Sequence, residues 1–446
     1  MKVSVIGTGY VGLVSGVCLA AKGHSVTCVD IREEIVRGIA EGKPHIHEKG
    51  LPELLRQVLD AGRFKTSKAE LKTLTGSRII MLAVDTPSNG GKIDLRQIEQ
   101  ATHYIGSYLR TTDESPSIVV KSTVIPGTTD TFVRKLIEET SGKKLGQFGL
   151  GMNPEFLREG MAVDDFMRPD RIILGHEDTE TLRRLKELYR PWSCEMLAVT
   201  SREAEFVKYA NNCLLATQIS AVNELANIAA GIGNIDMVEV LKGVHLDRRW
   251  SPSLADGNRV RPGILDYLWP GCGFGGSCFP KDIQALRAKA AEVGVQADLL
   301  AAVFEINTRQ RLRIVAILKE KLGALKGKKI LVLGLAFKPG TDDIRESPGI
   351  EITNRLIVEG ARLLVHDPVV EESAVNIALK CELVRDWQEA VATSDATVLI
   401  TPWPEYNKLK QLAAEGKMKG KIFMDSRCHF LASDFPGVSY CSVGHI

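Results

Sequence analysis

Residues 1–12 of the chain are MKVSVIGTGYVG, and this stretch decides how the N-terminal part folds. The apolar, β-branched run at residues 2–6 predicts a buried strand, and the glycines after it lead into an apolar helix from about Val11. A second strand is predicted at residues 25–30 and ends on Asp30. The order strand, glycine-rich turn, helix, strand and acid is the fingerprint of a dinucleotide-binding βαβ unit. We therefore expect a parallel-sheet domain that binds a dinucleotide at this turn.

Each part of the fingerprint has a physical role in binding NAD. Glycines permit the tight turn and let the backbone approach the pyrophosphate, whose charge the helix N-terminus stabilises. A carboxylate at Asp30 is expected to accept hydrogen bonds from the adenosine ribose and to repel the extra phosphate of NADP, although Arg32 would oppose that repulsion. The residues of this stretch that we expect to bind NAD are Gly7, Gly9, Tyr10, Val11, Gly12, Asp30 and Arg32.

The composition is that of an ordinary globular protein. A length of 446 residues exceeds one hydrophobic core of the usual size, so two or three domains are expected. The net charge of +2 comes from 57 basic and 55 acidic residues that are well mixed, which argues against a nucleic-acid partner. No apolar run approaches the roughly 20 residues that span a bilayer, and the N-terminus lacks the features of a signal peptide. We expect a cytoplasmic location and no membrane partner.

The nine cysteines are scattered singly along the chain. They form no CxxC pair, and no Cys/His spacing is typical of a zinc site, so we expect no metal site. In a reducing compartment most of them should be free thiols with the role of small core residues. Cys278 is the exception, because of the sequence around it.

Strands and helices alternate in the first and last parts of the chain but not in the middle. Strands are predicted at residues 2–6, 25–30, 78–83, 117–121, 171–174, 329–333, 362–366, 396–400 and 421–424. Residues 203–231 and 282–322 have helical periodicity instead. We expect an α/β protein with two Rossmann-like parallel-sheet domains joined by a long-helix central segment. The expected bounds are 1–200, 201–323 and 324–446.

Residues 271–282, GCGFGGSCFPKD, are poor in side chains, so their backbone amides are free to face a ligand. Small residues around Cys278 would suit close approach of a substrate. A cysteine nucleophile needs its thiolate, and Lys281 and Asp282 stand at the predicted start of the next helix. By itself the segment could also be a structural turn with a buried thiol.

Three further segments carry polar side chains in suggestive positions. Lys208 and Asn212 lie four residues apart in a predicted helix and could stabilise an oxyanion, although an isolated pair of this kind is more often a solvated helix face. Glu155 and Glu159 are four apart in NPEFLREG. The segment KSTVIPGT at 121–128 ends a strand, where the ligand-contacting loops of parallel sheets lie.

Together these residues resemble the UDP-glucose/GDP-mannose dehydrogenase family over essentially the whole chain. Six motifs match in order: GTGYVG, KSTVIPGT, NPEFLREG, KYANN, GFGGSCFPKD and FKPGTDDIRESP. The resemblance implies an N-terminal Rossmann domain for NAD, a long helix, and a second Rossmann-like domain that binds the UDP part of a nucleotide sugar.

The resemblance also implies roles for individual residues. The expected catalytic residues are Cys278 as nucleophile, Lys208, Asn212 and Asp282 around the reacting carbon, Glu155 in proton transfer or thioester hydrolysis, and Thr123 near the nicotinamide. Further NAD contacts are expected from Thr86, Thr123, Glu159, Lys281 and Arg345. Nucleotide-sugar contacts are expected from Glu155, Phe156, Leu157, Glu159, Lys208, Asn212, Arg261, Tyr267, Gly271, Gly275, Phe279, Phe337, Lys338 and Arg427.

The implied reaction is a four-electron oxidation of a sugar CH₂OH to a carboxylate by two NAD⁺, through a thiohemiacetal and a thioester on Cys278. The reactive segment is similar to the UDP-glucose branch of the family, while GDP-mannose and other nucleotide hexoses stay open. Two other classes are a two-electron NAD dehydrogenase, which would have no use for Cys278, and a non-catalytic dinucleotide-binding regulator.

The family pattern is broken at residues 246–262. The resemblance implies a short Asp-x-Arg-Ile-Gly segment before the cysteine, with an arginine that reaches into a neighbouring subunit. Here Arg249 matches the local motif, whereas Arg259 and Arg261 match the distance to Cys278, and the sequence does not choose among them. The resemblance implies a homodimer or larger homo-oligomer. The helix at 203–231 could bury that interface, or its apolar stripe could pack within the subunit.

Overall fold

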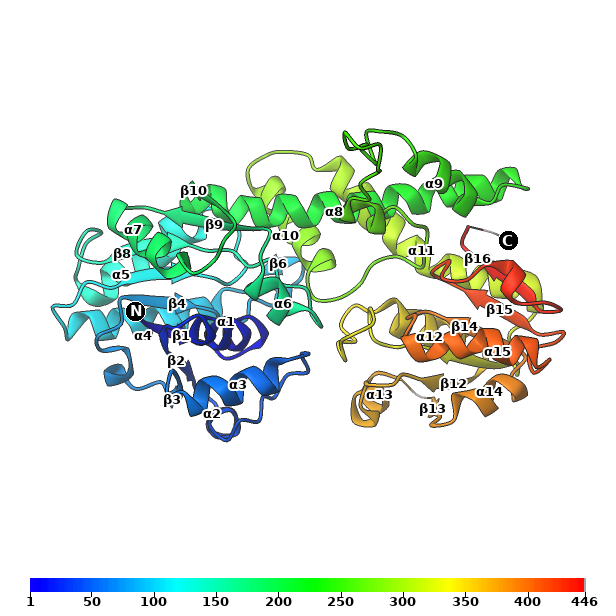
Figure 1. The fold of residues 1–446 in the computed structure, drawn as a ribbon, viewed down its shortest axis with the longest axis horizontal. Coiled ribbons are helices and arrows are strands. Elements are labelled where there is room, and N and C mark those ends of the chain that lie inside the picture. Colours follow the sequence, from blue (N-terminus) through cyan, green and yellow to red (C-terminus); the bar gives the residue numbers. More distant parts are fainter. Residues whose placement is uncertain (380, 445–446) are drawn as a thin grey trace. The chain divides into compact units, whose positions relative to one another are not determined.

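The computed structural model describes residues 1–379 and 381–444 (Figure 1). The chain forms two compact units, Met1–Asn211 and Asn212–Ile446, and the division falls inside the long helix α8 (Ser201–Ile232). Each unit is built around a sheet of Rossmann-like topology. The predicted class, two such α/β domains with a long-helix segment, is therefore confirmed. The bounds of the three predicted segments stay a prediction.

The sheet of the first unit has the strand order β10-β9-β8-β7-β4-β1-β2-β3, and every neighbouring pair is parallel except β8 with β9. Its strands are β1 (Lys2–Ile6), β2 (Ser25–Asp30), β3 (Phe64–Lys68), β4 (Ile79–Leu82), β7 (Ser117–Val120), β8 (Gly149–Met152), β9 (Arg171–His176) and β10 (Glu195–Val199). A short hairpin, β5 (Ser88–Asn89) with β6 (Lys92–Ile93), lies outside the sheet. The order turns back at β1 and β4, so the ends of these strands define the switch point where ligands bind in such sheets.

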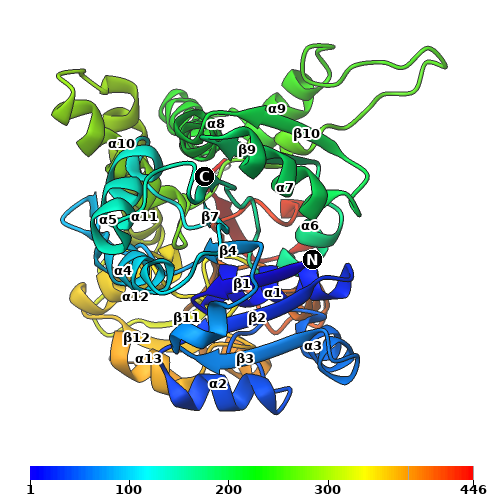
Figure 2. The same cartoon turned by 90° about the vertical axis from the view of Figure 1, so that its left-hand side faces the viewer.

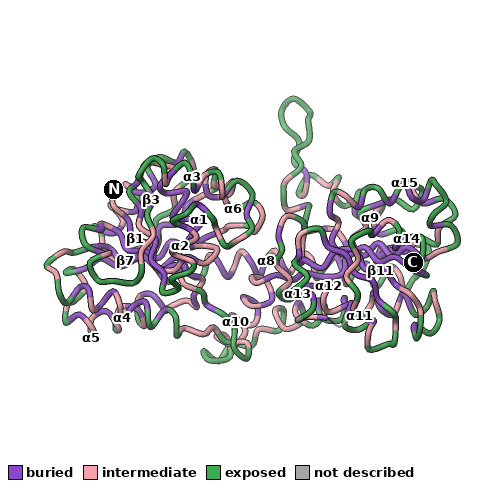
Figure 3. Tube along the Cα trace, turned by 90° about the horizontal axis from the view of Figure 1, so that it is seen from below, coloured by how far each residue is buried: buried purple, intermediate pink, exposed green. Residues whose placement is uncertain are grey.

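Helices cover both faces of this sheet (Figure 2). One face packs against α1 (Tyr10–Ala21), α3 (Leu51–Asp60), α6 (Ala162–Met167) and α7 (Thr179–Tyr189), and the other against α4 (Arg96–Arg110) and α5 (Arg134–Ser141). The remaining helical pieces are α2 (Glu33–Ala40), η1 (Leu71–Leu74) and the π-helical turn η2 (Thr128–Val133). The central strands β1, β4, β7 and β8 are buried on both faces, as Figure 3 shows for β1 and β7, which explains why their sequences are mostly apolar.

Four helices follow the first sheet in sequence. They are α8, α9 (Met237–His245), α10 (Phe279–Glu292) and α11 (Asp298–Leu322), with the short turn η3 (Gly263–Tyr267) between α9 and α10. The predicted helical stretch at 282–322 is thus two helices, because Gly294 adopts a left-handed φ of 75° and ends α10. Asp236 starts α9 by accepting a hydrogen bond from the backbone N–H of Val238.

The sheet of the second unit has the order β13-β12-β11-β14-β15-β16, with all pairs parallel. Its strands are β11 (Lys329–Leu333), β12 (Arg362–His366), β13 (Glu382–Leu383), β14 (Ala396–Leu399), β15 (Ile422–Asp425) and β16 (Ser439–Ser442). The associated helices are α12 (Pro348–Val358), α13 (Glu372–Ala378), α14 (Trp387–Thr393), η4 (Pro404–Lys408), α15 (Leu409–Ala414) and η5 (Ala432–Asp434). In the described part of the chain we find no helix that is both long enough and apolar enough to cross a membrane.

Candidate active site

The turn after β1 leaves no space for a side chain at Gly7 or at Gly12. Gly7 has a left-handed φ of 95°, and a Cβ there would lie 2.6 Å from the carbonyl oxygen of Ala83. A Cβ on Gly12 would overlap the carbonyl oxygen of Gly7. The backbone amides at the start of α1 are therefore open to a ligand that approaches closely. This cradle fits the pyrophosphate of a dinucleotide.

Asp30 ends β2 beside this turn and is almost completely buried. It accepts hydrogen bonds from the backbone N–H groups of Thr8, at 3.1 Å, and Arg32, at 3.0 Å, and from the Arg32 guanidinium. Burial alone would raise the pKa of Asp30, but the bonds from Arg32 and Thr8 lower it to about 2. Asp30 is thus a carboxylate at neutral pH, as a ribose acceptor must be, and Arg32 is paired with it.

The hydroxyl of Tyr10 bonds to a side chain of the protein itself. Its hydroxyl donates to the buried carboxylate of Glu48, which also accepts from the backbone N–H groups of Gly160, at 2.7 Å, and Ala162, at 2.8 Å. Glu48 therefore ties α1 to the segment that carries Glu159. No motif singled out Glu48, because its partners are distant in the sequence.

Thr86 and Thr123 come together at the carboxyl ends of β4 and β7. The Thr86 hydroxyl donates to the backbone carbonyl of Thr123 at 2.8 Å. The hydroxyl of Ser122 donates to the carbonyl of Val84 at 2.6 Å. The loops after two neighbouring central strands thus form one surface at the switch point of the sheet.

Glu155 and Lys208 form a buried ion pair. Lys208 Nζ lies 2.8 Å from one carboxylate oxygen of Glu155, whose other oxygen accepts from the backbone N–H of Leu157 at 2.7 Å. Burial opposes ionisation of Glu155, but Lys208 outweighs it and lowers the pKa of the carboxyl. The ring of Phe156 is close to two cations, with the guanidinium carbon of Arg171 4.2 Å and Lys208 Nζ 5.6 Å from the ring centroid. Glu159 is half-buried at the end of the same segment.

Cys278 occupies the N-cap position of α10 in the second unit and is partly exposed. Its carbonyl accepts the first helical hydrogen bond, from Asp282, and its Sγ lies 3.7 Å from the Ser277 hydroxyl. The positive end of a helix dipole favours a thiolate at this position.

Asp282 lies one turn into α10 with its carboxylate almost completely buried. One oxygen accepts from the Asn212 side chain at 2.7 Å, and the other pairs with Lys281 Nζ at 2.7 Å. Asn212 follows Lys208 by one turn of α8. The structure therefore brings Asn212, Lys281 and Asp282 together at the helix that Cys278 begins.

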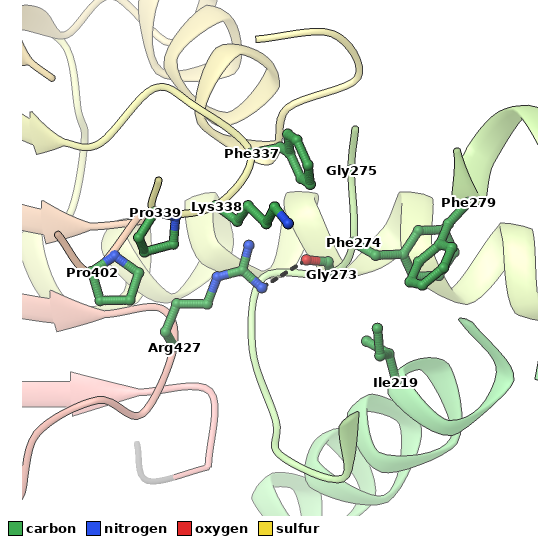
Figure 4. Close-up of a pocket in the computed structure, with 10 residues that line it drawn as sticks. All are labelled: Ile219, Gly273, Phe274, Gly275, Phe279, Phe337, Lys338, Pro339, Pro402 and Arg427. Atoms are coloured by element: carbon green, nitrogen blue, oxygen red, sulfur yellow. Dashed lines mark hydrogen bonds between the residues drawn. The ribbon is translucent and has the colours of Figure 1, made fainter. Parts of the chain in front are cut away.

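A cavity of about 290 Å³ in the second unit is lined by Ile219, Gly273, Phe274, Gly275, Phe279, Phe337, Lys338, Pro339, Pro402 and Arg427 (Figure 4). Arg427 donates to the Gly273 carbonyl at 2.9 Å and extends beside Lys338, so two cations lie in one apolar pocket. The Phe337 ring packs against Gly276, where a Cβ would be 2.8 Å from a ring carbon. Such a pocket can hold a diphosphate and the base or sugar next to it.

Of the other predicted ligand contacts, Tyr267 and Gly271 lie near residues that line the cavity. Arg345 and the three alternative arginines are not among its lining residues. Tyr267 packs near Phe279 with ring centroids 6.4 Å apart, and the Cβ of a side chain at Gly271 would be 3.4 Å from Arg427. Arg345 is largely exposed and paired with Asp343. The three alternative arginines are not among the residues that line the cavity: Arg249 pairs with Asp247, Arg259 donates to the Leu246 carbonyl and Arg261 pairs with Asp266.

Comparison with known proteins identifies the family. Residues 1–193 match the NAD binding domain of the UDP-glucose/GDP-mannose dehydrogenase family, residues 202–309 its central domain and residues 331–431 its UDP binding domain. The chain belongs to the UDP-glucose/GDP-mannose dehydrogenase family. NAD is the cofactor of its first unit, and its third matched region is that of the UDP binding domain.

Named relatives act on more than one nucleotide sugar. The chain is 38% identical to a UDP-glucose 6-dehydrogenase of Haloferax volcanii, with 96% of each protein covered, and 37% identical to a GDP-mannose 6-dehydrogenase of Pseudomonas aeruginosa, with 90% of this chain and 91% of the relative covered. A UDP-glucose dehydrogenase structure from Pyrobaculum islandicum has a TM-score of 0.90 and 36% identity, and covers 100% of this chain and 98% of its own. Overall identity alone therefore does not choose the hexose.

Proposed function

We propose that this protein oxidises UDP-glucose to UDP-glucuronate with two NAD⁺ and one water, through a thioester on Cys278. The observation that supports this most is the position of Cys278 at the N-terminus of α10, with Lys281 and Asp282 in the first turn and Asn212 of α8 hydrogen-bonded to Asp282. A two-electron alcohol dehydrogenase has no use for a thiol at this position, and a binding protein has no use for the buried charges that accompany it.

NAD⁺, when bound, supplies the hydride acceptor for both oxidations. The glycines at 7, 9 and 12 would hold its pyrophosphate, Asp30 its ribose, and Tyr10, Val11 and Arg32 would shape the surface around them. Thr86, Thr123, Glu159, Lys281 and Arg345 are the further NAD contacts that we propose.

The first oxidation converts the C6 alcohol to an aldehyde. Asp282, or a water that it orients, takes the hydroxyl proton, while Lys208 and Asn212 stabilise the developing alkoxide. Loss of a hydride and this proton accounts for the two electrons removed. The buried position of Asp282 keeps bulk water from competing for the proton.

The second oxidation needs the thiol. The Cys278 thiolate adds to the aldehyde carbon to form a thiohemiacetal, whose oxyanion collapses to the thioester as the second hydride leaves. Water then cleaves the C–S bond and releases the carboxylate. Glu155, which is held ionised by Lys208, assists the proton transfers of this hydrolysis.

The UDP part is proposed to lie in the cavity of the second unit, with its diphosphate held by Lys338 and Arg427. Gly271, Gly275, Phe279, Phe337 and Tyr267 would contact the nucleotide sugar there. Phe156, Leu157 and Arg261 are the remaining proposed sugar contacts. The alternative substrate of the same chemistry is GDP-mannose, because a GDP-mannose 6-dehydrogenase shares 37% identity with the chain.

We further propose a homodimer in the cytoplasm. The exposed apolar stripe on α8 supports the dimer. The nine free cysteines support a reducing compartment.

The first test is the number of NADH molecules formed per UDP-glucose, with excess NAD⁺ and the product identified by mass. Two NADH and UDP-glucuronate are expected. One NADH with an aldehyde or ketone product would refute the thioester scheme. Turnover of GDP-mannose but not of UDP-glucose would show that GDP-mannose, and not UDP-glucose, is the substrate.

A further inference from the structure

One polar face of α11 contacts the glycine-rich segment 271–276 that leads to Cys278. Asn307, Gln310 and Arg311 are three and four residues apart, so they share a face of the helix. All three are buried although they are polar. Buried polar groups need hydrogen-bond partners, and the partners here are mostly backbone groups of residues 271–276.

The contacts hold this segment at Gly271 and at Phe274. Asn307 accepts from the backbone N–H of Phe274 at 2.7 Å and donates to its carbonyl at 3.0 Å. Gln310 donates to the carbonyl of Gly271 at 2.9 Å. Nη2 of Arg311 also donates to the Phe274 carbonyl, at 3.0 Å. The Asn307 side chain thus bonds both backbone groups of Phe274, as a neighbouring strand would do in a sheet.

Arg311 also reaches a second segment, at residues 345–346. The same Nη2 lies 3.2 Å from the carbonyl of Glu346, and Nη1 pairs with Glu351 in α12. Glu346 has a left-handed φ of 51°, a conformation that a non-glycine residue keeps only when its surroundings hold it. The backbone N–H of Gly276 donates to the carbonyl of Arg345 at 3.0 Å. The two segments therefore meet at one guanidinium.

We propose that Arg311 and Asn307 are positioning residues that hold residues 271–276 and 345–346 as one body and thereby fix Cys278 at the start of α10. The proposal rests on the proposed function only in taking Cys278 as the nucleophile. Four of the six residues at 271–276 are glycines, so the segment has much conformational freedom to lose and needs side chains from elsewhere to order it. A displacement of the reacting thiol by about 1 Å can cost roughly 100-fold in rate.

The test is hydrogen–deuterium exchange of the full-length protein, followed by mass spectrometry. In Arg311→Met, we expect residues 271–276 and 341–347 both to exchange at least about tenfold faster, because opening either segment frees the other. Asn307→Asp keeps the acceptor for Phe274 N–H but loses the donor, so it should also loosen both segments. The control is Arg313→Met, since Arg313 lies on the same helix but pairs with Glu320 near the surface.

Turnover with UDP-glucose supplies the second readout. Arg311→Met and Asn307→Asp should lower kcat by roughly 100-fold, and Arg311→Lys should recover only part of the loss, because an ammonium cannot span the two carbonyls and the carboxylate. Unchanged exchange at 341–347 in Arg311→Met would overturn the proposal. If that variant does not fold, the exchange of Asn307→Asp decides. A wild-type protein that oxidises no nucleotide sugar would refute the proposed function and leave the exchange result valid.

Discussion

Burial of the Glu155–Lys208 ion pair opposes folding. Both side chains are almost completely buried, and taking two charges out of water costs several kcal/mol for each ion. An apolar pair of similar size would stabilise the fold at least as well. A buried pair that is retained in the first unit, next to the segment that ends on Glu159, is therefore better explained by chemistry than by stability.

This explanation makes a prediction for a double-mutant cycle. Lys208→Met leaves the Glu155 carboxylate buried without its cation and should lower the free energy of unfolding by about 3–5 kcal/mol. The double variant Lys208→Met/Glu155→Gln should regain most of that free energy in a urea titration. Its turnover should nevertheless stay at the level of the single variant. A double variant as unstable as the sum of the two single variants would contradict this account.

Glu205 gives the first unit a pH dependence. It is buried on α8 and accepts from the backbone N–H groups of Gly127, at 2.6 Å, and Thr129, at 2.8 Å. Burial raises the pKa of Glu205 to about 7, against the effect of these bonds. Because the folded pKa lies above the unfolded one, the stability linked to this group is complete below about 4.5 and falls as pH rises through about 7.

The measurement compares unfolding of the wild type with that of Glu205→Gln across this pH range. The stability of the wild type relative to the variant should decrease by roughly 1–3 kcal/mol between pH 4.5 and 8. A constant difference would mean that Glu205 has the same pKa in the folded and unfolded states, and a relative stability that rises with pH would mean that folding lowers this pKa.

At the scale of elements, periodicity predicted the strands, turns and helices whose signal lies within one segment. It missed side chains whose role depends on residues distant in the sequence. The strand at 2–6, the turn at 7–12 and the helix α8 each follow from spacing within one segment. Sequence reasoning also placed Cys278 next to the start of a helix, because Lys281 and Asp282 stand at that predicted start. Asn307 and Glu48 gave no such signal, since each acts on backbone groups more than 30 residues away.

The cysteine segment also makes a prediction about glycine. A Cβ on Gly275 would overlap the carbonyl oxygen of Glu346 and lie 2.8 Å from Cδ of Pro348, both rigid parts of the chain. Gly275→Ala should therefore destabilise the second unit by about 1–3 kcal/mol and weaken UDP binding in calorimetry. Gly243→Ala in α9 is the matched control, because nothing lies within 4 Å of its Cβ. It should be neutral or more stable by up to about 1 kcal/mol. Equal UDP affinity in both variants would show that close packing at Gly275 does not shape the cavity.

At the scale of the whole molecule, α8 presents an apolar stripe that the chain itself leaves uncovered. Leu214, Leu225, Ile228 and Ile232 are each more than half exposed. They are spaced by 11, 3 and 4 residues, which places them on one side of a helix. Four large apolar side chains in one row are typical of an interface, and a second copy of the same helix would offer a complementary row. The stripe therefore favours a dimer over packing within the subunit.

Removal of this stripe should separate the subunits without unfolding them. Leu225→Glu/Ile228→Glu places charges at positions that are exposed in the single chain, so the melting temperature of the chain itself has no reason to fall through lost core contacts. In sedimentation velocity at micromolar concentration the wild type should be a dimer and the variant a monomer. Leu197→Glu, at an equally exposed leucine on β10, should leave the dimer intact.

Loss of activity in the monomeric variant, with the reaction retained in Leu197→Glu, would mean that the site needs a residue from the partner subunit. Full activity of the monomer would instead place every catalytic group within one chain, and Arg249, Arg259 and Arg261 would then have no role in a neighbour.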